Sequence, residues 1–244
     1  MVRQEKAKPT TAIVVVGLIA VTVGIAGAVL DTRDAQTDAT RTANPTSPTF
    51  SVTPMPLPTT ETPKPVPVRG EDGVYRIDGH LVVNKTYPLP ADYAPGGLTP
   101  ETQAAFDAMR ADAAQAGVSL RIVSGYRSFG DQQTTYDGNV GSKGPELADR
   151  LSARPGHSEH QAGLAIDVNS LYPSFGSTPE GRWVADNAHR FGFVVRYPDG
   201  KEQVTGFTYE PWHLRYFGVE LATVLHEGGL TFEEYYGLTS VYPE

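Results

Sequence analysis

The sequence contains no cysteine among its 244 residues, which excludes both disulfide bonds and thiolate metal sites. Any metal ion bound by this chain must therefore be held by histidine, aspartate or glutamate. Positive charge is also scarce, because 20 Lys and Arg stand against 28 Asp and Glu and the formal net charge is −8. Nucleic-acid-binding proteins present a basic face, so this balance argues against a nucleic-acid partner.

Three common signatures of hydrolytic enzymes are missing as well. The sequence has no His-Glu-x-x-His, the helical motif of many zinc peptidases. It has neither Ser-x-x-Lys nor Gly-x-Ser-x-Gly, which counts against a serine acyl-enzyme mechanism.

A long uncharged run occurs near the N-terminus, where residues 12–30 form a stretch of nineteen residues without a charge. An α-helix of that length spans nearly the whole hydrocarbon core of a bilayer. Basic residues lie before the run, within 1–11, which predicts a cytoplasmic N-terminus, a transmembrane signal anchor at 12–30 and an extracytoplasmic remainder. A cleaved signal peptide, and hence a secreted protein, is the alternative, because Ala26-Gly27-Ala28 fits a small-x-small cleavage site.

Residues 31–69 show no hydrophobic periodicity. Eight prolines and eight Ser or Thr lie between Ala43 and Arg69, a composition that cannot bury a core and favours an extended, disordered linker. Such a linker could lift a tethered domain into a surrounding wall, and a spacer of no special reach is the alternative. The folded domain is predicted over 70–244, where 13 basic and 23 acidic residues give a net charge of −10.

Helix and strand patterns alternate within that domain. Capping residues and helical periodicity predict helices at 99–116, 145–153, 178–191, 219–226 and 232–236. Alternation and buried apolar runs predict strands at 118–123, 164–168, 193–197 and 207–216. This mixture predicts an α+β fold in which helices flank a small antiparallel sheet.

Asp167 lies within the apolar run 164–168, where a carboxylate is costly unless it is paired or bound to a metal. His160 precedes it by seven residues, and on a straight strand the two side chains would face opposite sides. Gly163 is the natural pivot between them. We therefore expect His160 at the edge of a loop and Asp167 inside a strand, with both facing one ion.

A second cluster, Glu-Pro-Trp-His, occupies 210–213. Pro211 interrupts a strand pattern and indicates an edge or a bend, which would let Glu210 and His213 approach the same point. Two neutral imidazoles and one carboxylate leave a fourth position on zinc for water. A carboxylate that is not a ligand can take the proton of that water. Glu210 suits this role, and we expect the ring of Trp212 to raise its pKa.

Three blocks of sequence carry a specific resemblance: SGYRS at 124–128, PGHSEHQAGLAID at 155–167 and EPWH at 210–213. In this order they resemble the VanY-type D-alanyl-D-alanine carboxypeptidases, within the wider LAS group of metallopeptidases. The resemblance covers residues 75–216 and implies the fold of the hedgehog-like, D-Ala-D-Ala metallopeptidases. It also implies a carboxypeptidase that removes the C-terminal D-amino acid from peptidoglycan stem peptides.

The resemblance implies one Zn²⁺ per chain, bound by His160, Asp167 and His213. Glu210 would activate water and then protonate the leaving amine. Arg127 would stabilise the scissile carbonyl as it becomes an oxyanion. Contacts with substrate are implied for four further residues, Gln132, Ser158, Tyr126 and Trp212.

The same residues are compatible with an L,D-carboxypeptidase or a peptidoglycan endopeptidase, so the three blocks do not determine which bond is cut. A wall-binding domain without catalysis is disfavoured, because the three ligands and the base are all present. Two histidines and a carboxylate can also bind iron or another divalent metal. The expected partners are the stem peptide and, through residues 12–30, the membrane, and we expect a monomer.

Overall fold

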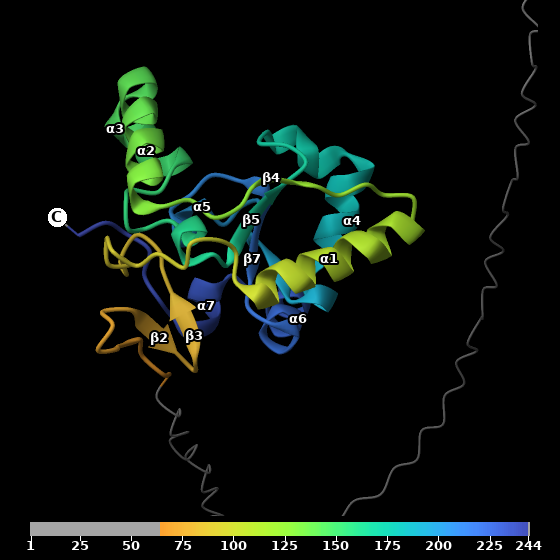
Figure 1. Cartoon of the computed structure of the whole chain (residues 1–244), viewed down its shortest axis with the longest axis horizontal. Coiled ribbons are helices and arrows are strands. Elements are labelled where there is room, and N and C mark those ends of the chain that lie inside the picture. Colours follow the sequence, from red (N-terminus) through yellow and green to blue (C-terminus); the bar gives the residue numbers. More distant parts are fainter. Residues whose placement is uncertain (1–63, 244) are drawn as a thin grey trace, which may run out of the picture. The chain divides into compact units, whose positions relative to one another are not determined.

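The computed structural model describes residues 64–243, and the anchor predicted at 12–30 lies outside the described residues. Within the described part, no helix has the length and apolar character needed to cross a membrane. The α+β fold with a small antiparallel sheet is confirmed, and a second small sheet accompanies the predicted one (Figure 1).

The central sheet has four antiparallel strands in the order β4-β5-β7-β6 (Figure 1). Their bounds are Ile122–Ser124 (β4), Ala165–Val168 (β5), Phe193–Tyr197 (β6) and Glu210–Tyr216 (β7). β5 and β7 are the inner strands, and their register places Asp167 directly opposite His213. The pairing of two backbones thus brings together residues that lie 46 positions apart in the sequence.

One face of this sheet is packed by helices into an apolar core. α1 (Pro100–Gln115) begins at the predicted N-cap Thr99, whose side chain accepts a hydrogen bond from the amide of Thr102. α4 (Pro179–Asn187) continues into the 3-10 helix η3 (Ala188–Phe191). Residues from all these elements form the core, including Phe106, Met109, Val168, Val184, Phe193, Ile166 and Leu214.

The opposite face of the sheet carries charge. Side chains alternate along a strand, so Ile166 and Leu214 enter the core while Asp167, His213 and Arg215 point away from it. These three charged or titratable side chains are nevertheless buried, because other elements cover this face as well.

The N-terminal elements form a second sheet of three strands, β1 (Val68–Arg69), β2 (Tyr75–Ile77) and β3 (His80–Val82). β2 and β3 pack with α6 (Val219–Gly228) and α7 (Phe232–Tyr236) in a separate apolar cluster. This hairpin was not predicted. The signal for it was Asp78-Gly79, since both residues adopt positive φ and this dipeptide favours a tight hairpin turn.

Three further helices surround the site described below: α2 (Phe129–Lys143), α3 (Pro145–Leu151) and α5 (Glu202–Thr205). Figure 1 shows α2 and α3 side by side, projecting from the central sheet. α2 has a single buried residue, Gln132, so its sequence lacks the apolar periodicity that predicts a helix.

Two predicted strands begin later than expected. The strand predicted at 118–123 is regular only at Ile122–Ser124, although Val118 and Leu120 are buried in the core. The strand predicted at 207–216 begins at Glu210. The edge position considered for Pro211 is wrong, because β7 is an inner strand, and its pairing with β6 instead shifts register in this region.

Candidate metal centre

His160 reaches the site from a short 3-10 helix, η1 (Glu159–Ala162), which precedes β5. Gly163 ends this helix at a φ of 69°, and a Cβ atom at this position would collide with the carbonyl oxygen of Gly97. Glycine is therefore required at the pivot between His160 and Asp167. The His160 Nδ1 lies 2.7 Å from the carbonyl oxygen of Gly125, to which it donates, so Nε2 faces Asp167 at 3.3 Å.

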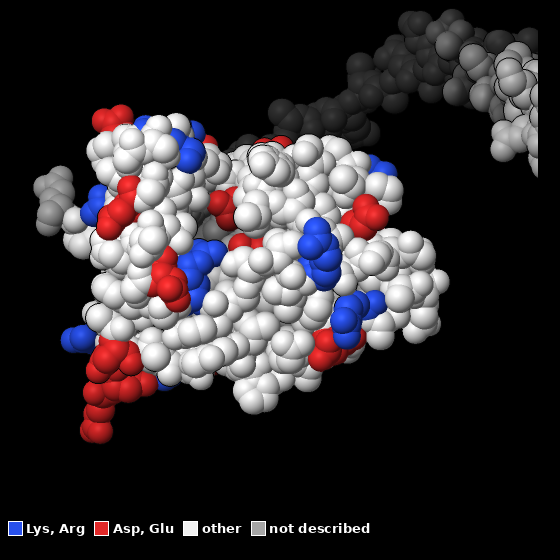
Figure 2. All heavy atoms as spheres, turned by 45° about the horizontal axis from the view of Figure 1, so that its top comes forward, with Lys and Arg blue, Asp and Glu red and all other residues white. Residues whose placement is uncertain are grey.

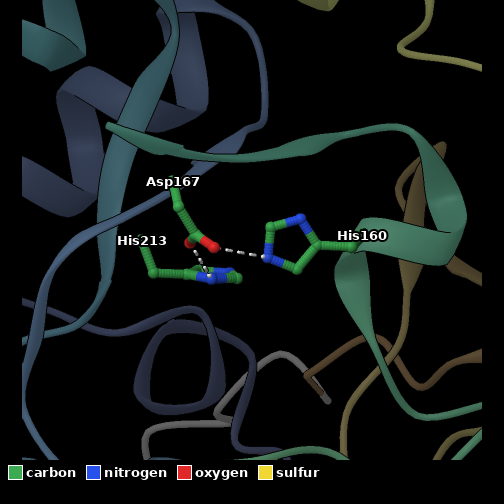
Figure 3. A group of neighbouring side chains, drawn as sticks. All are labelled: His160, Asp167 and His213. Atoms are coloured by element: carbon green, nitrogen blue, oxygen red, sulfur yellow. Dashed lines mark hydrogen bonds and ion pairs between the residues drawn. The ribbon is translucent and has the colours of Figure 1, made fainter. Parts of the chain in front are cut away.

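The three predicted ligands converge on one point (Figure 3). The Asp167 carboxylate lies between the two imidazoles, with Oδ1 at 3.1 Å from Nδ1 of His213. All three residues are buried, and one donor atom from each lies within 4.8 Å of the others. Two imidazole nitrogens and one carboxylate oxygen form the donor set of many catalytic zinc sites, so these residues fit the metal that the sequence predicts.

The electrostatics of this group favour a bound cation. Burial opposes ionisation of Asp167, but the two neighbouring imidazoles outweigh it and hold the pKa of Asp167 well below its usual range. Burial likewise disfavours a charged His213, yet its contacts with Asp167 and Glu159 raise its pKa to about 9. A carboxylate that stays ionised between two imidazoles attracts positive charge, which a divalent metal supplies.

Glu210 lies beside the metal ligands without joining them. It is buried, and its Oε2 is 3.9 Å from Nδ1 of His213. Burial raises the pKa of Glu210 to about 7. A carboxylate with a pKa near neutrality can exchange a proton in either direction at physiological pH.

Arg127 is held toward the same space by two side chains. Its Nη2 donates to Oγ of Ser124 at 2.8 Å and its Nη1 donates to Oε1 of Gln132 at 2.9 Å. Gln132 is fixed in turn, because its amide nitrogen donates to Ser152 and to the carbonyl oxygen of Ala153. Gln132 is thus a buried residue that orients Arg127.

The ligands, Glu210 and Arg127 line one cavity of about 370 Å³. The cavity lies between α2 and α3 on one side and the 3-10 helix η2 (Pro173–Ser177) on the other. Figure 2 shows a hollow between two lobes of the surface, with acidic and basic side chains at the hollow. Ser158 and Trp212 also line the cavity, whereas Tyr126 is half-buried and does not.

Sequence reasoning missed a buried charge cluster behind His213. Nε2 of this histidine lies 3.2 Å from Oε2 of Glu159, and Oε1 of Glu159 accepts from Arg196 and Arg215 at 2.7 and 3.1 Å. Arg196 also donates to Glu233 through two nitrogens, at 2.7 and 2.5 Å. Part of the signal was present, because Arg196 occupies a strand that is otherwise apolar, as Asp167 does.

The four remaining histidines do not line this cavity. His157 is hydrogen bonded through Nδ1 to the carbonyl oxygen of Asn84 and packs against Tyr242. His189 and His226 stack on each other with ring centroids 3.8 Å apart. His80 packs edge-on against Phe217.

Known proteins resemble this chain in sequence and in structure. Residues 96–219 match the family model described as VanY, D-alanyl-D-alanine carboxypeptidase. A putative carboxypeptidase of Bacillus subtilis, YodJ, is 42% identical over 179 residues, which cover 64% of this chain and 66% of the relative. A D-alanyl-D-alanine carboxypeptidase of Enterococcus faecalis is 38% identical, covering 64% of each chain. The match thus spans just under two thirds of these curated relatives.

Two solved structures extend the comparison. The L,D-carboxypeptidase DacB of Streptococcus pneumoniae is 39% identical with a TM-score of 0.65, covering 73% of this chain and 99% of that one. The D,D-pentapeptidase VanY of a VanB-type vancomycin resistance cassette, solved with Zn(II), is 35% identical with a TM-score of 0.56, covering 63% and 96%. With a family model matched over half of its length, this chain belongs to the VanY family of D-alanyl-D-alanine carboxypeptidases.

Proposed function

We propose that this protein is a zinc-dependent carboxypeptidase that removes the C-terminal D-alanine from peptidoglycan stem peptides. The observation that carries the proposal is the composition of one cavity. Three converging metal ligands, a glutamate with a pKa of about 7 and a fixed arginine line the same space, in a chain of the VanY family.

His160, Asp167 and His213 would hold the metal. Bound zinc would act as a Lewis acid toward the scissile carbonyl and make water more acidic. The Zn(II) complex of the related VanY structure supports this choice of metal.

The acid–base chemistry falls to Glu210. Its ionised form accepts a proton from the attacking water, and the protonated form returns that proton to the amine of the departing D-alanine. Burial, which raises the pKa of Glu210 in the metal-free protein, favours a carboxyl group that can hold the proton between these two steps.

Arg127 supplies a positive charge for the developing oxyanion. Because Gln132 and Ser124 hold its guanidinium before substrate arrives, little reorganisation is needed during the reaction. Ser158 and Trp212 line the cavity at positions where they could contact the terminal residues of the stem peptide.

A second candidate is an L,D-carboxypeptidase, which cuts one residue earlier in the stem. The structural match supports it, because DacB aligns with a TM-score of 0.65 and the D,D-pentapeptidase with 0.56. Endopeptidase action is a third candidate, since an L-alanyl-D-glutamate endopeptidase of Bacillus subtilis is 38% identical over 80 residues. An extracytoplasmic domain tethered by residues 12–30 is part of the proposal, since its substrate lies in the cell wall.

The test is mass spectrometry of the products that the zinc-loaded full chain releases from synthetic stem pentapeptide and tetrapeptide. Loss of one D-alanine from the pentapeptide alone supports the D,D-activity. Loss from the tetrapeptide alone replaces it with the L,D-activity, and internal fragments replace it with the endopeptidase. Inert protein that contains zinc would overturn the enzymatic proposal, and Glu210→Gln serves as the negative control in each reaction.

A further inference from the structure

We propose that Glu159 is a positioning residue for the metal centre, which holds the His213 ring so that Nδ1 faces the metal and Nε2 carries the proton. The inference rests on the proposed function only in requiring that His160, Asp167 and His213 bind a metal. It concerns a residue that lies behind the ligands and has no role in the chemistry assigned above.

The two nitrogens of His213 face two different carboxylates. Nδ1 lies 3.1 Å from Asp167, the neighbouring ligand, whereas Nε2 lies 3.2 Å from Oε2 of Glu159. A neutral imidazole carries one proton, and a carboxylate can only accept a hydrogen bond. With Nδ1 turned toward the metal, the proton belongs on Nε2, where it is donated to Glu159. Such carboxylate–histidine–metal arrangements fix the tautomer and orientation of the ligand.

The two carboxylate oxygens of Glu159 contact different residues. Oε2 contacts His213, while Oε1 accepts hydrogen bonds from both Arg196 and Arg215. The arginines thus fix the carboxylate in place and leave one oxygen for the histidine. Because Glu159 and His160 are consecutive in η1, one short turn supplies a ligand and the residue that orients another ligand.

The two arginines are anchored by distant parts of the chain. Arg196 is bound through two nitrogens to Glu233 of α7, which also accepts a hydrogen bond from Asn84. Arg215 donates to the carbonyl oxygen of Leu81 in β3. The orientation of His213 therefore depends on β3 of the second sheet and on α7, which lie outside the cavity.

The plane of the His213 ring is restrained as well. Tyr197, on β6, packs against it with ring centroids 4.8 Å apart and an interplanar angle of 32°. Contacts on one face of the ring and on both nitrogens leave little freedom for a flip that would exchange Nδ1 and Nε2.

A buried salt-bridge cluster could instead serve stability alone, and two matched variants separate these roles. Glu159→Gln and Glu233→Gln each neutralise a fully buried glutamate bound to Arg196, but only Glu159 contacts His213. Both variants should lower the melting temperature. Glu159→Gln alone should also weaken zinc binding roughly 10- to 100-fold, measured by competition with a chelating indicator on the folded full chain. Unchanged zinc affinity in Glu159→Gln, or an equal loss in both variants, would overturn the proposal.

A measurement on the unmutated protein tests the tautomer of His213 even if Glu159→Gln fails to fold. In the ¹⁵N-histidine-labelled, zinc-loaded full chain, NMR should show the His213 proton on Nε2. A proton on Nδ1 would contradict the proposal for Glu159 without affecting the carboxypeptidase proposal. Zinc bound with the expected tautomer in a protein inert on stem peptides leaves Glu159 in its role and sinks only the enzymatic function. A chain that binds no zinc sinks both.

Discussion

Two buried glutamates flank His213, and their surroundings shift their pKa values in opposite directions. Glu210 lines the cavity, and burial raises its pKa to about 7. Glu159 is buried even more deeply, but Arg196 and Arg215 outweigh its burial and hold its pKa well below the usual range. The difference shows that burial alone does not decide the charge of a carboxylate, because the neighbouring cations do. The proton can therefore move at Glu210 while Glu159 remains a fixed anion.

The arginines on the two sides differ in the same way. Arg127 is half-buried, bound by neutral side chains and open to the cavity, so its charge is available to substrate. Arg196 is buried between Glu159 and Glu233, and its charge is used within the fold. The residues on the cavity side of His213 are thus available for catalysis, whereas those on the other side stabilise the fold.

The largest expected effect comes from removing the reactive carboxylate. Glu210→Gln should lower kcat by roughly 10²- to 10⁴-fold, because it removes the carboxylate proposed to take the proton from water. Zinc content should stay at one per chain, since Glu210 is not among the three converging ligands. Steady-state kinetics on the preferred stem peptide and metal analysis of the same sample provide the measurement.

The ligand variant His213→Ala is the control for that experiment. It should lose zinc as well as activity, because it removes one of the three donor atoms. Wild-type turnover in Glu210→Gln would show that another group is the base. Glu210 would then have no catalytic role to set against the structural role of Glu159.

The next largest effect should separate the two arginines. Arg127→Gln should lower kcat by roughly 10²- to 10³-fold through loss of oxyanion stabilisation, with little change in stability. Arg196→Gln should instead destabilise the fold by about 3–5 kcal/mol, because it leaves two buried glutamates without their shared partner. Urea unfolding and kinetics on both variants measure the contrast. If Arg127→Gln unfolds as readily as Arg196→Gln, the division into a reactive and a structural side is wrong.

Asp167 could be predicted on physical grounds alone, whereas His160, His213, Glu210 and Arg127 were identified mainly through the resemblance of three sequence blocks to a known family. A carboxylate in an apolar strand, a glycine pivot and a proline in a strand each violate a local preference, and such violations mark sites. Asp167 in β5 and Gly163 at positive φ match the expectation, and His160 lies on a short 3-10 turn beside the strand. The α+β class followed from periodicity because α1, α4 and β5 are regular and face one core.

The ion pairs on the structural side of His213 could not be predicted from the sequence. Arg196 breaks the apolar pattern of β6 as Asp167 breaks that of β5, but the glutamate partners of Arg196 and Arg215 lie 37 to 56 residues away and only the fold shows them. α2 was missed because it buries Gln132 alone, although Ser128 caps its N-terminus and α3 packs against it. The role of Gln132 in holding Arg127 depends on that unpredicted helix.

The smallest predicted effect tests the raised pKa of Glu210 without any catalysis. In the metal-free protein, the folded state keeps Glu210 protonated up to a pH of about 7, whereas in the unfolded chain it ionises near 4.5. The unfolded state therefore releases its proton first, and the stability from this group is lost as the pH rises from 4.5 through 7. A shift of this size corresponds to about 3 kcal/mol. Glu210→Gln cannot ionise, so its stability relative to the unmutated protein should grow over that interval and then level off above pH 7. Urea unfolding of chelator-treated proteins between pH 4 and 8 measures this difference. A constant difference across the range would mean that Glu210 is already ionised in the folded protein, and that the two glutamates beside His213 do not differ in charge.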